Sequence, residues 1–171
     1  MDIDKIAQSM LETIDDAIEE VTQTLNEDPR EGTFTCSEGE MISMLRQFLT
    51  AKYVIEISYR NFADRITGPW RDGLVDHLYE HAKEERDHQY SLTMKLVSMG
   101  VDPMIGTIQI PQVSPEIRSL FQNLMELELQ ALEVERKIIA CCGDNVGLRV
   151  LIETMAERDD HHLQDLKRMS E

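Results

Sequence analysis

The sequence predicts an all-α protein: a four-helix bundle with one long crossover between its second and third helices, and an extra amphipathic helix at the N-terminus. Three observations predict this fold class. Apolar residues recur every three or four positions along four long segments, which is the period of a helix with one buried face. Capping residues, glycines and prolines separate these segments. A chain of 171 residues is also long enough for one domain with a sizeable core.

The N-terminal region, residues 1–36, is predicted to form an acidic amphipathic helix followed by a linker. Apolar residues line one side of residues 3–25, and acidic residues occupy the other sides. Residues 1–40 carry twelve acidic side chains and two basic ones, so most of the formal net charge of −16 lies there. We therefore separate this region from the predicted bundle, residues 37–171.

The first two bundle helices are bounded by clear signals. Ser37 and Glu40 match the Ser-x-x-Glu capping box that opens a helix. The helix is predicted to run to about Thr67, where a Gly-Pro pair ends it and Pro69 can occupy the first turn of the next helix. The second helix is predicted to end near Gly100, after about 30 residues or about 45 Å.

A non-helical segment, residues 101–114, then connects the second helix to the third. It contains two prolines, a glycine and a β-like stretch, Thr107–Ile110. Fully extended, the segment reaches about 46–50 Å, which matches the length of the second helix. It can therefore cross the whole bundle, so that the third helix starts at the same end as the second. Ser114-Pro115 is predicted to begin the third helix, and residues 142–145 to form a short hairpin into the fourth.

Each of the four predicted bundle helices has a stripe of apolar residues that faces inward. Two of these stripes are interrupted by a carboxylate and a histidine three residues apart. The pairs are Glu85 with His88 and Asp159 with His162. Carboxylates and imidazoles are costly in a helix core unless they pair with each other or bind a cation. The other two stripes also carry charged residues, and these are Lys52, Glu56, Glu128 and Glu135. This pattern is typical of bundles that hold metal ions between inward carboxylates and Glu-x-x-His pairs.

On these motifs, over residues 40–170, the chain resembles the ferritin-like superfamily, near its bacterioferritin and Dps-like mini-ferritin branch. The resemblance implies a ferroxidase centre with two iron ions per subunit, manganese and zinc being the other candidate metals. It also implies the metal ligands, which are Glu85, His88, Glu128, His162 and, where the family has Glu, Asp159. No haem is predicted, because Arg86 stands where bacterioferritins have a haem-binding Met.

The first bundle helix departs from the family pattern. Lys52 stands where the resemblance places a Glu ligand, and Glu56 follows one turn later. Glu56 is our candidate for the replacement ligand, and the alternatives are that it pairs with Lys52 or that Lys52 extends to solvent. Tyr59 matches a family Tyr that could donate a hydrogen bond to a bridging ligand or an electron, although plain core packing is the other interpretation.

Two further assignments have alternatives, namely the metal ligands on the fourth helix and the role of Glu135. Glu157 with His161 has a spacing that could also bind a metal, but only Asp159 and His162 continue the apolar stripe, so His161 is predicted at the surface. Glu135 follows Glu128 by seven residues. It is interpreted as a carboxylate outside the ligand set, or as an ion-pair partner of a basic residue.

The leading functional hypothesis is oxidation of Fe(II) within the bundle by oxygen or peroxide, for iron storage or detoxification. Oxygen ligands suit both oxidation states, and each histidine supplies one nitrogen. One alternative is a degenerate scaffold in which Lys52 replaces a metal ligand and the protein has a structural role. Another is a di-metal oxidase acting on an organic substrate.

Charge and composition restrict partners and location. The acidic chain has no basic footprint for nucleic acid, and no apolar run approaches the roughly 20 residues of a membrane span. A cytoplasmic homo-oligomer is expected. The resemblance implies a twelve-subunit shell or a smaller oligomer, since the fifth helix of larger ferritin shells has no room. The three cysteines make no disulfide framework or Cys-x-x-Cys motif, so free thiols are predicted.

Overall fold

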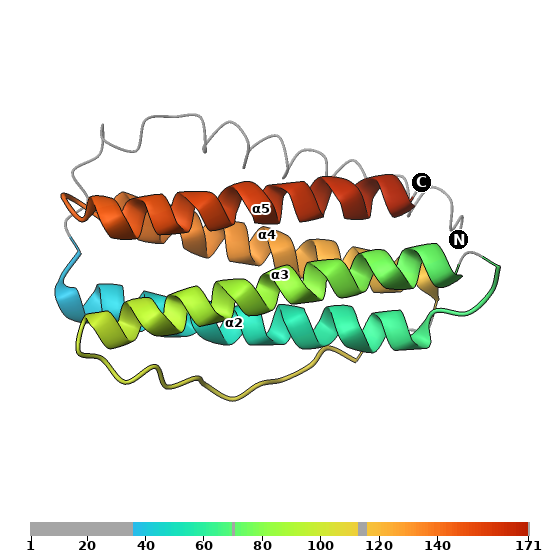
Figure 1. Cartoon of the computed structure of the whole chain (residues 1–171), viewed down its shortest axis with the longest axis horizontal. Helices are drawn as coiled ribbons and strands as arrows, with labels where there is room; N and C mark the ends of the chain where they lie inside the picture. Colours follow the sequence, from blue (N-terminus) through green and yellow to red (C-terminus); the bar gives the residue numbers. More distant parts are fainter. Residues whose placement is uncertain (1–35, 70, 113–115, 171) are drawn as a thin grey trace, which may run out of the picture. The chain divides into compact units, whose positions relative to one another are not determined.

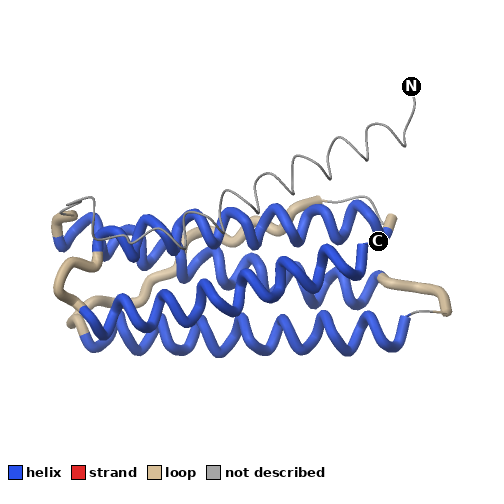
Figure 2. Tube along the Cα trace, turned by 90° about the horizontal axis from the view of Figure 1, so that it is seen from above, coloured by secondary structure: helices blue, strands red, loops and turns tan. Residues whose placement is uncertain are grey.

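Four long helices form the described part of the chain, which in this computed structural model comprises residues 36–69, 71–112 and 116–170 (Figure 1). They are α2 (Glu38–Arg65), α3 (Arg71–Ser98), α4 (Ile117–Cys141) and α5 (Val146–Ser170). Figure 2 draws helices and loops but no strand among these residues. The predicted all-α four-helix bundle is therefore confirmed. The predicted N-terminal helix and linker lie outside the described residues, and the domain division stays a prediction.

The helices follow the predicted topology with one crossover (Figure 1). α3 runs antiparallel to α2, and the segment after α3 passes back along the bundle before α4 begins. α5 returns antiparallel to α4, so that α3 and α4 run in the same direction. The most extensive contacts join α2 to α3 and α4 to α5, and α2 also packs against α4. None of the described helices has both the length and the apolar character that a bilayer span requires.

The helix boundaries follow from local chemistry. The predicted capping box is present: the Ser37 hydroxyl accepts from the Glu40 N–H at 3.3 Å, and the Ser37 N–H donates to the Glu40 carboxylate at 2.8 Å. The Asn145 side chain caps α5 by accepting from the Leu148 N–H at 3.1 Å. α4 has Glu116 as its N-cap, and this side chain makes no capping hydrogen bond to the first turn. The predicted Ser114-Pro115 start lies outside the described residues.

The core is built from the predicted stripes. Side chains such as Leu45, Leu78, Leu124 and Ile152 are at most 1% exposed. The stripe positions of α2 and α5 are buried along nearly their whole length, which includes the polar positions. A helix of 28 residues spans about 42 Å, so the polar positions lie near the middle of the bundle, with apolar layers on both sides.

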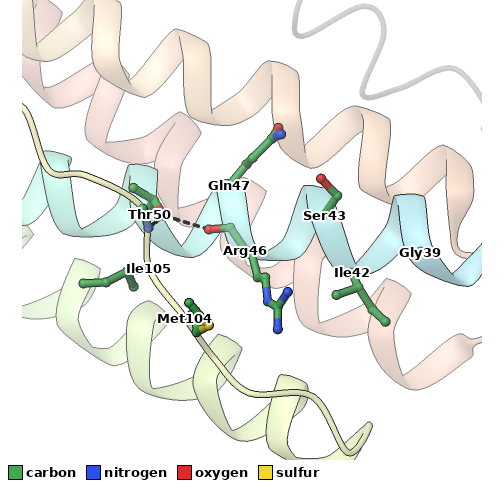
Figure 3. A pocket seen from close by; sticks show the side chains of 9 residues that line it. Gly39, Ile42, Ser43, Arg46, Gln47, Thr50, Met104 and Ile105 are labelled. Carbon is green, nitrogen blue, oxygen red and sulfur yellow. Dashed lines mark hydrogen bonds between the residues drawn. The ribbon is translucent and has the colours of Figure 1, made fainter.

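Polar contacts join the crossover to α2, and Figure 3 shows the pocket that Met104 and Ile105 of the crossover line together with Arg46 and Thr50 of α2. The Arg46 guanidinium donates to the Asp102 carbonyl at 3.1 and 2.8 Å. Thr50 donates to the Arg46 carbonyl at 2.9 Å and accepts from the Gly106 N–H at the same distance. A Cβ at Gly106 would lie 3.6 Å from the Thr50 side chain, an ordinary contact distance. The predicted β-like stretch, Thr107–Ile110, forms no strand here.

A disulfide joins Cys36, just before α2, to Cys141, the last residue of α4. The prediction of free thiols is wrong for these two residues, because the bundle brings together cysteines that are 105 positions apart. Cys142 is free and buried, as predicted. Disulfides are uncommon in the reducing cytosol, so this bond gives no support to the predicted cytoplasmic location, which stays a prediction.

Removing this crosslink will destabilise the oxidised protein. Cys36→Ser is expected to lower the free energy of unfolding by about 2–4 kcal/mol, because the bond closes a long loop and restricts the unfolded chain. Urea unfolding with and without a reducing agent measures the effect, and the reduced wild type serves as the control. Equal stability of the oxidised and reduced wild type would contradict the crosslink.

Candidate metal centre

Four polar side chains from three helices meet at the centre of the bundle. They are Glu85 of α3, Glu128 of α4, and Asp159 and His162 of α5, and each is fully buried. Each offers a ligand atom, and these atoms lie within 4.8 Å of one another. Helical spacing explains the meeting, because a carboxylate and a histidine three residues apart project from the same face.

His162 is oriented as a metal ligand requires. Its Nδ1 lies 3.2 Å from Glu128 Oε1 and 3.3 Å from Glu85 Oε1. Its Nε2 lies 2.6 Å from the carboxylate of Glu84, which also accepts from Arg158 at 3.1 Å. Histidines that bind metals commonly have their second ring nitrogen held in this way. Sequence reasoning missed Glu84, whose only signal was its position beside Glu85.

Lys52 lies inside the cluster. Its Nζ contacts Asp159 closely, lies 3.1 Å from Glu85 Oε2, and is fully buried. The alternative in which Lys52 extends to solvent is therefore wrong, because these two carboxylates hold the ammonium in the core. Burial opposes the charged form, but the attraction of Asp159 and Glu85 outweighs it and raises the pKa of Lys52 above its usual value.

His88 lies on the same side of the cluster as Lys52. Its Nδ1 is 3.5 Å from Asp159 Oδ1 and 3.6 Å from Glu85 Oε1, and it has no hydrogen-bond partner among the described residues. Glu85 Oε1 thus faces both His162 and His88, while Asp159 faces His88 and Lys52. The Lys52 ammonium therefore occupies one cation position beside the group of four side chains.

Glu56 is not brought into the cluster. Its carboxylate accepts from Arg60 at 3.3 Å and from Arg86 at 2.9 Å, which directs it toward the rim of the bundle. The pairing of Glu56 with Lys52, the other alternative that the sequence left open, is not formed either, since Lys52 contacts Glu85 and Asp159 instead. Arg86 comes from α3, so the spacing along α2 could not reveal this contact.

Tyr59 is bonded to the cluster through Glu128. Its hydroxyl donates to Glu128 Oε1 at 2.5 Å, and the side chain is fully buried. Burial and the neighbouring Glu128 carboxylate raise the pKa of Tyr59 well above its usual value, so the hydroxyl keeps its proton. The position fits the predicted hydrogen bond to a ligand, and the predicted role as an electron donor stays a prediction.

Comparison with known proteins identifies the family. The family model described as Ferritin-like domain matches residues 42–171. The chain belongs to this ferritin-like family. A crystal structure described as ferritin like, diiron-carboxylate proteins from Bacillus anthracis str. Ames has a TM-score of 0.74 with 21% sequence identity, over 80% of this chain and 100% of that one. At that identity the likeness concerns the fold. No curated protein matches the chain.

This ferritin-like protein buries more acid than base in its centre. Glu135, which the sequence placed outside the ligand set, is also fully buried, and neither of its carboxyl oxygens has a hydrogen-bond donor among the described residues. Burial and repulsion by Glu85 and Glu128 raise the pKa of Glu135 to about 8, although Lys52 opposes this. Burial and repulsion by Glu135 raise the pKa of Asp159 well above its usual value, although Lys52 opposes this.

Four carboxylates therefore share one ammonium, which leaves three negative charges if every carboxylate is ionised and His162 is neutral. Protons or a metal cation must balance these charges, because each unpaired buried ion costs several kcal/mol. The donor set of carboxylate oxygens and imidazole nitrogens suits iron, manganese and zinc. The residues thus fit the metal that the family resemblance implies. The specific bacterioferritin or Dps-like branch stays a prediction.

Lys52→Met will destabilise the metal-free protein by about 3–5 kcal/mol at pH 7, because it leaves buried carboxylates without their cation. Burial alone would raise the pKa of Glu85, but Lys52 holds it well below 4.5. The variant therefore loses the full amount of unfolding free energy above about pH 4.5. This loss becomes smaller as the pH falls through the pKa of Glu85 in the folded protein. Denaturant unfolding at pH 7 and at lower pH measures this loss.

Lys137→Met, which removes only an exposed pair with Glu133, is the matched control, with an expected loss of unfolding free energy below about 1 kcal/mol. Equal losses in the two variants would refute the role of Lys52.

Metal binding is expected to release protons at neutral pH. Burial alone would lower the pKa of His162, but hydrogen bonds to Glu128 and Glu85 raise it to about 11, so the metal-free ring is protonated. A metal must displace this proton, and its affinity will rise about tenfold per pH unit for each proton released. Calorimetric titration with Zn²⁺ in two buffers of different ionisation enthalpy counts the protons. His162→Gln is the control and will release one proton fewer. No proton release by the wild type at pH 7 would contradict this account.

Proposed function

We propose that this protein binds one iron ion per bundle between Glu85, Glu128, Asp159 and His162, and that it takes up Fe(II) and oxidises it to Fe(III) for storage or detoxification. The observation that carries the proposal is the convergence of these four buried side chains while Lys52 occupies the neighbouring cation position. Oxygen or peroxide would accept the electron. Manganese or zinc are the alternative metals.

The charge of the centre supports one iron rather than two. With Lys52 charged, His162 neutral and Glu135 holding the proton that its raised pKa implies, the other three carboxylates leave two negative charges. One Fe(II) balances these two charges. Two iron ions beside Lys52 would leave an excess of positive charge in the core, which is costly to bury.

Residues around the four ligands have definite tasks in this proposal. Glu84 accepts from His162 Nε2 and keeps Nδ1 directed at the metal position. Tyr59 donates to Glu128 and stabilises one of its oxygens, and it is close enough to supply an electron through that ligand. Lys52 neutralises Glu85 and Asp159 on the side away from His162.

A second candidate is the di-iron ferroxidase that the sequence predicted. The observation that favours it is His88, whose Nδ1 faces Glu85 and Asp159 without a hydrogen bond. If Lys52 withdrew, these three side chains would offer ligands for a second iron. Storage in either form also calls for a shell of subunits, so a homo-oligomer, with twelve chains as the first candidate, is part of the proposal. Oxidation of an organic substrate gains no support of its own.

Lys52→Glu separates these functions. Anaerobic titration with Fe(II), followed by exposure to oxygen, is expected to give one iron per wild-type chain and two per variant chain, with faster oxidation in the variant. Glu85→Ala with His88→Ala is the negative control and will bind no iron at this centre, while circular dichroism shows the helices retained.

Each other outcome selects a different function. Two irons per wild-type chain would replace the proposal with the di-iron ferroxidase. No iron in the wild type, restored by Lys52→Glu, would identify the degenerate scaffold. Unchanged iron uptake by the Glu85 and His88 double variant would remove the iron site from this centre.

A further inference from the structure

A second group of histidines lies beside the metal centre, between α3 and α5. His77 and His81 are four residues apart on one face of α3, and Asp165 of α5 faces them. Asp165 Oδ2 lies 3.1 Å from His77 Nε2 and 3.5 Å from His81 Nε2. His161, which is exposed as predicted, brings its Nδ1 within 3.4 Å of the same oxygen.

We propose that His77, His81 and Asp165 form a second binding site for a divalent transition-metal ion, with His161 or water completing the coordination. The ligand atoms of the three residues lie within 4.8 Å of one another. Two imidazoles and one carboxylate are a donor set that zinc and iron(II) both accept. The site shares no ligand with the centre described above, and it does not depend on the proposed function.

The distances are compatible with a metal ion, although His77 and Asp165 form a hydrogen bond in its absence. In a tetrahedral zinc site with bonds of about 2.0–2.1 Å, neighbouring ligand atoms lie about 3.3 Å apart. The three contacts to Asp165 Oδ2, at 3.1, 3.4 and 3.5 Å, bracket that value. A single carboxylate oxygen cannot satisfy three imidazole nitrogens well by hydrogen bonding, since it has two lone pairs.

His81 gives an independent reason for a ligand. The residue is only 4% exposed, and its Nδ1 has no hydrogen-bond partner among the described residues. Its Nε2 faces Asp165 at a distance longer than a good hydrogen bond. Coordination of a metal ion would give Nε2 the close partner that it lacks.

The competing cation is Arg168, which lies on the far side of the carboxylate. It contacts Asp165 Oδ1, and the three histidines face Oδ2. Asp165 can therefore keep Arg168 while its other oxygen binds a metal. A carboxylate held by an arginine in this way has a fixed orientation, as ligands in metal sites commonly do.

The second site lies between solvent and the central ligands. The side chains of His77 and His161 are 37% and 64% exposed. The inner His81 ring stacks on the His162 ring, with centroids 4.2 Å apart and an interplanar angle of 21°. An ion can therefore reach this site from the surface without passing through the apolar core.

Zn²⁺ titration of the full chain tests the proposal. In a background of Glu85→Ala with His88→Ala, which removes the central site, we expect one Zn²⁺ per chain to remain. Adding His77→Ala will weaken that binding by more than the 10–100-fold that loss of an outer-shell partner costs. His77 is partly exposed, so the variant will fold, and Asp165→Asn is the second variant. Titration with Co²⁺ adds a spectral readout, because its visible absorption reports the coordination geometry.

Asp76→Ala is the matched control, since this exposed carboxylate precedes His77 but is not one of the proposed ligands. It will leave the Zn²⁺ affinity unchanged. The proposal is overturned if the central-site variant binds no Zn²⁺, or if Asp76→Ala weakens binding as much as His77→Ala does. It is also overturned if His77→Ala and Asp165→Asn both retain full affinity. Failure of iron oxidation at the central site leaves these outcomes unaffected.

Discussion

The pairing of buried Lys52 with Glu85 and Asp159 is the interaction on which the centre of this bundle depends. Burying four carboxylates in a helical core would cost many kcal/mol if they were ionised and unpaired. The ammonium from α2 compensates carboxylates from α3 and α5, so three helices meet in one ionic network. Because one lysine cannot balance four acids, protons or the proposed metal ion must balance the rest. Stability and the proposed metal binding would therefore have a common electrostatic origin.

The two halves of the bundle differ at the position of Lys52 on α2 and Glu128 on α4. α2 with α3 and α4 with α5 are antiparallel pairs, and each contributes a carboxylate-x-x-His motif. Glu128 of α4 belongs to the group of four side chains proposed as ligands, whereas Lys52 takes the corresponding position on α2. The two halves thus become unequal, because one contributes an ammonium where the other contributes a carboxylate. This asymmetry separates the chain from the pattern that its family resemblance implied.

Much of the fold could be predicted because helices convert sequence spacing into position. The capping box at Ser37, the crossover and the inward positions of Glu85 and Asp159 all follow from local signals. Three features could not be predicted, since each depends on contacts distant in sequence. Lys52 is long enough to point either way, and only the facing carboxylates fix it. Arg86 of α3 draws Glu56 outward. Cys36 and Cys141 meet only once α2 and α4 are packed.

The disulfide also closes part of the chain into a covalent ring. Cys36 and Cys141 enclose α2, α3, the crossover and α4, while α5 follows outside the ring. In the oxidised protein, α5 is thus the described helix that the crosslink does not restrain. It carries Asp159 and His162, half of the four-ligand group. If α5 detached, the group of four side chains would be exposed to solvent and would lose two of its members. The ring would still connect α2, α3 and α4, against which α5 could pack again.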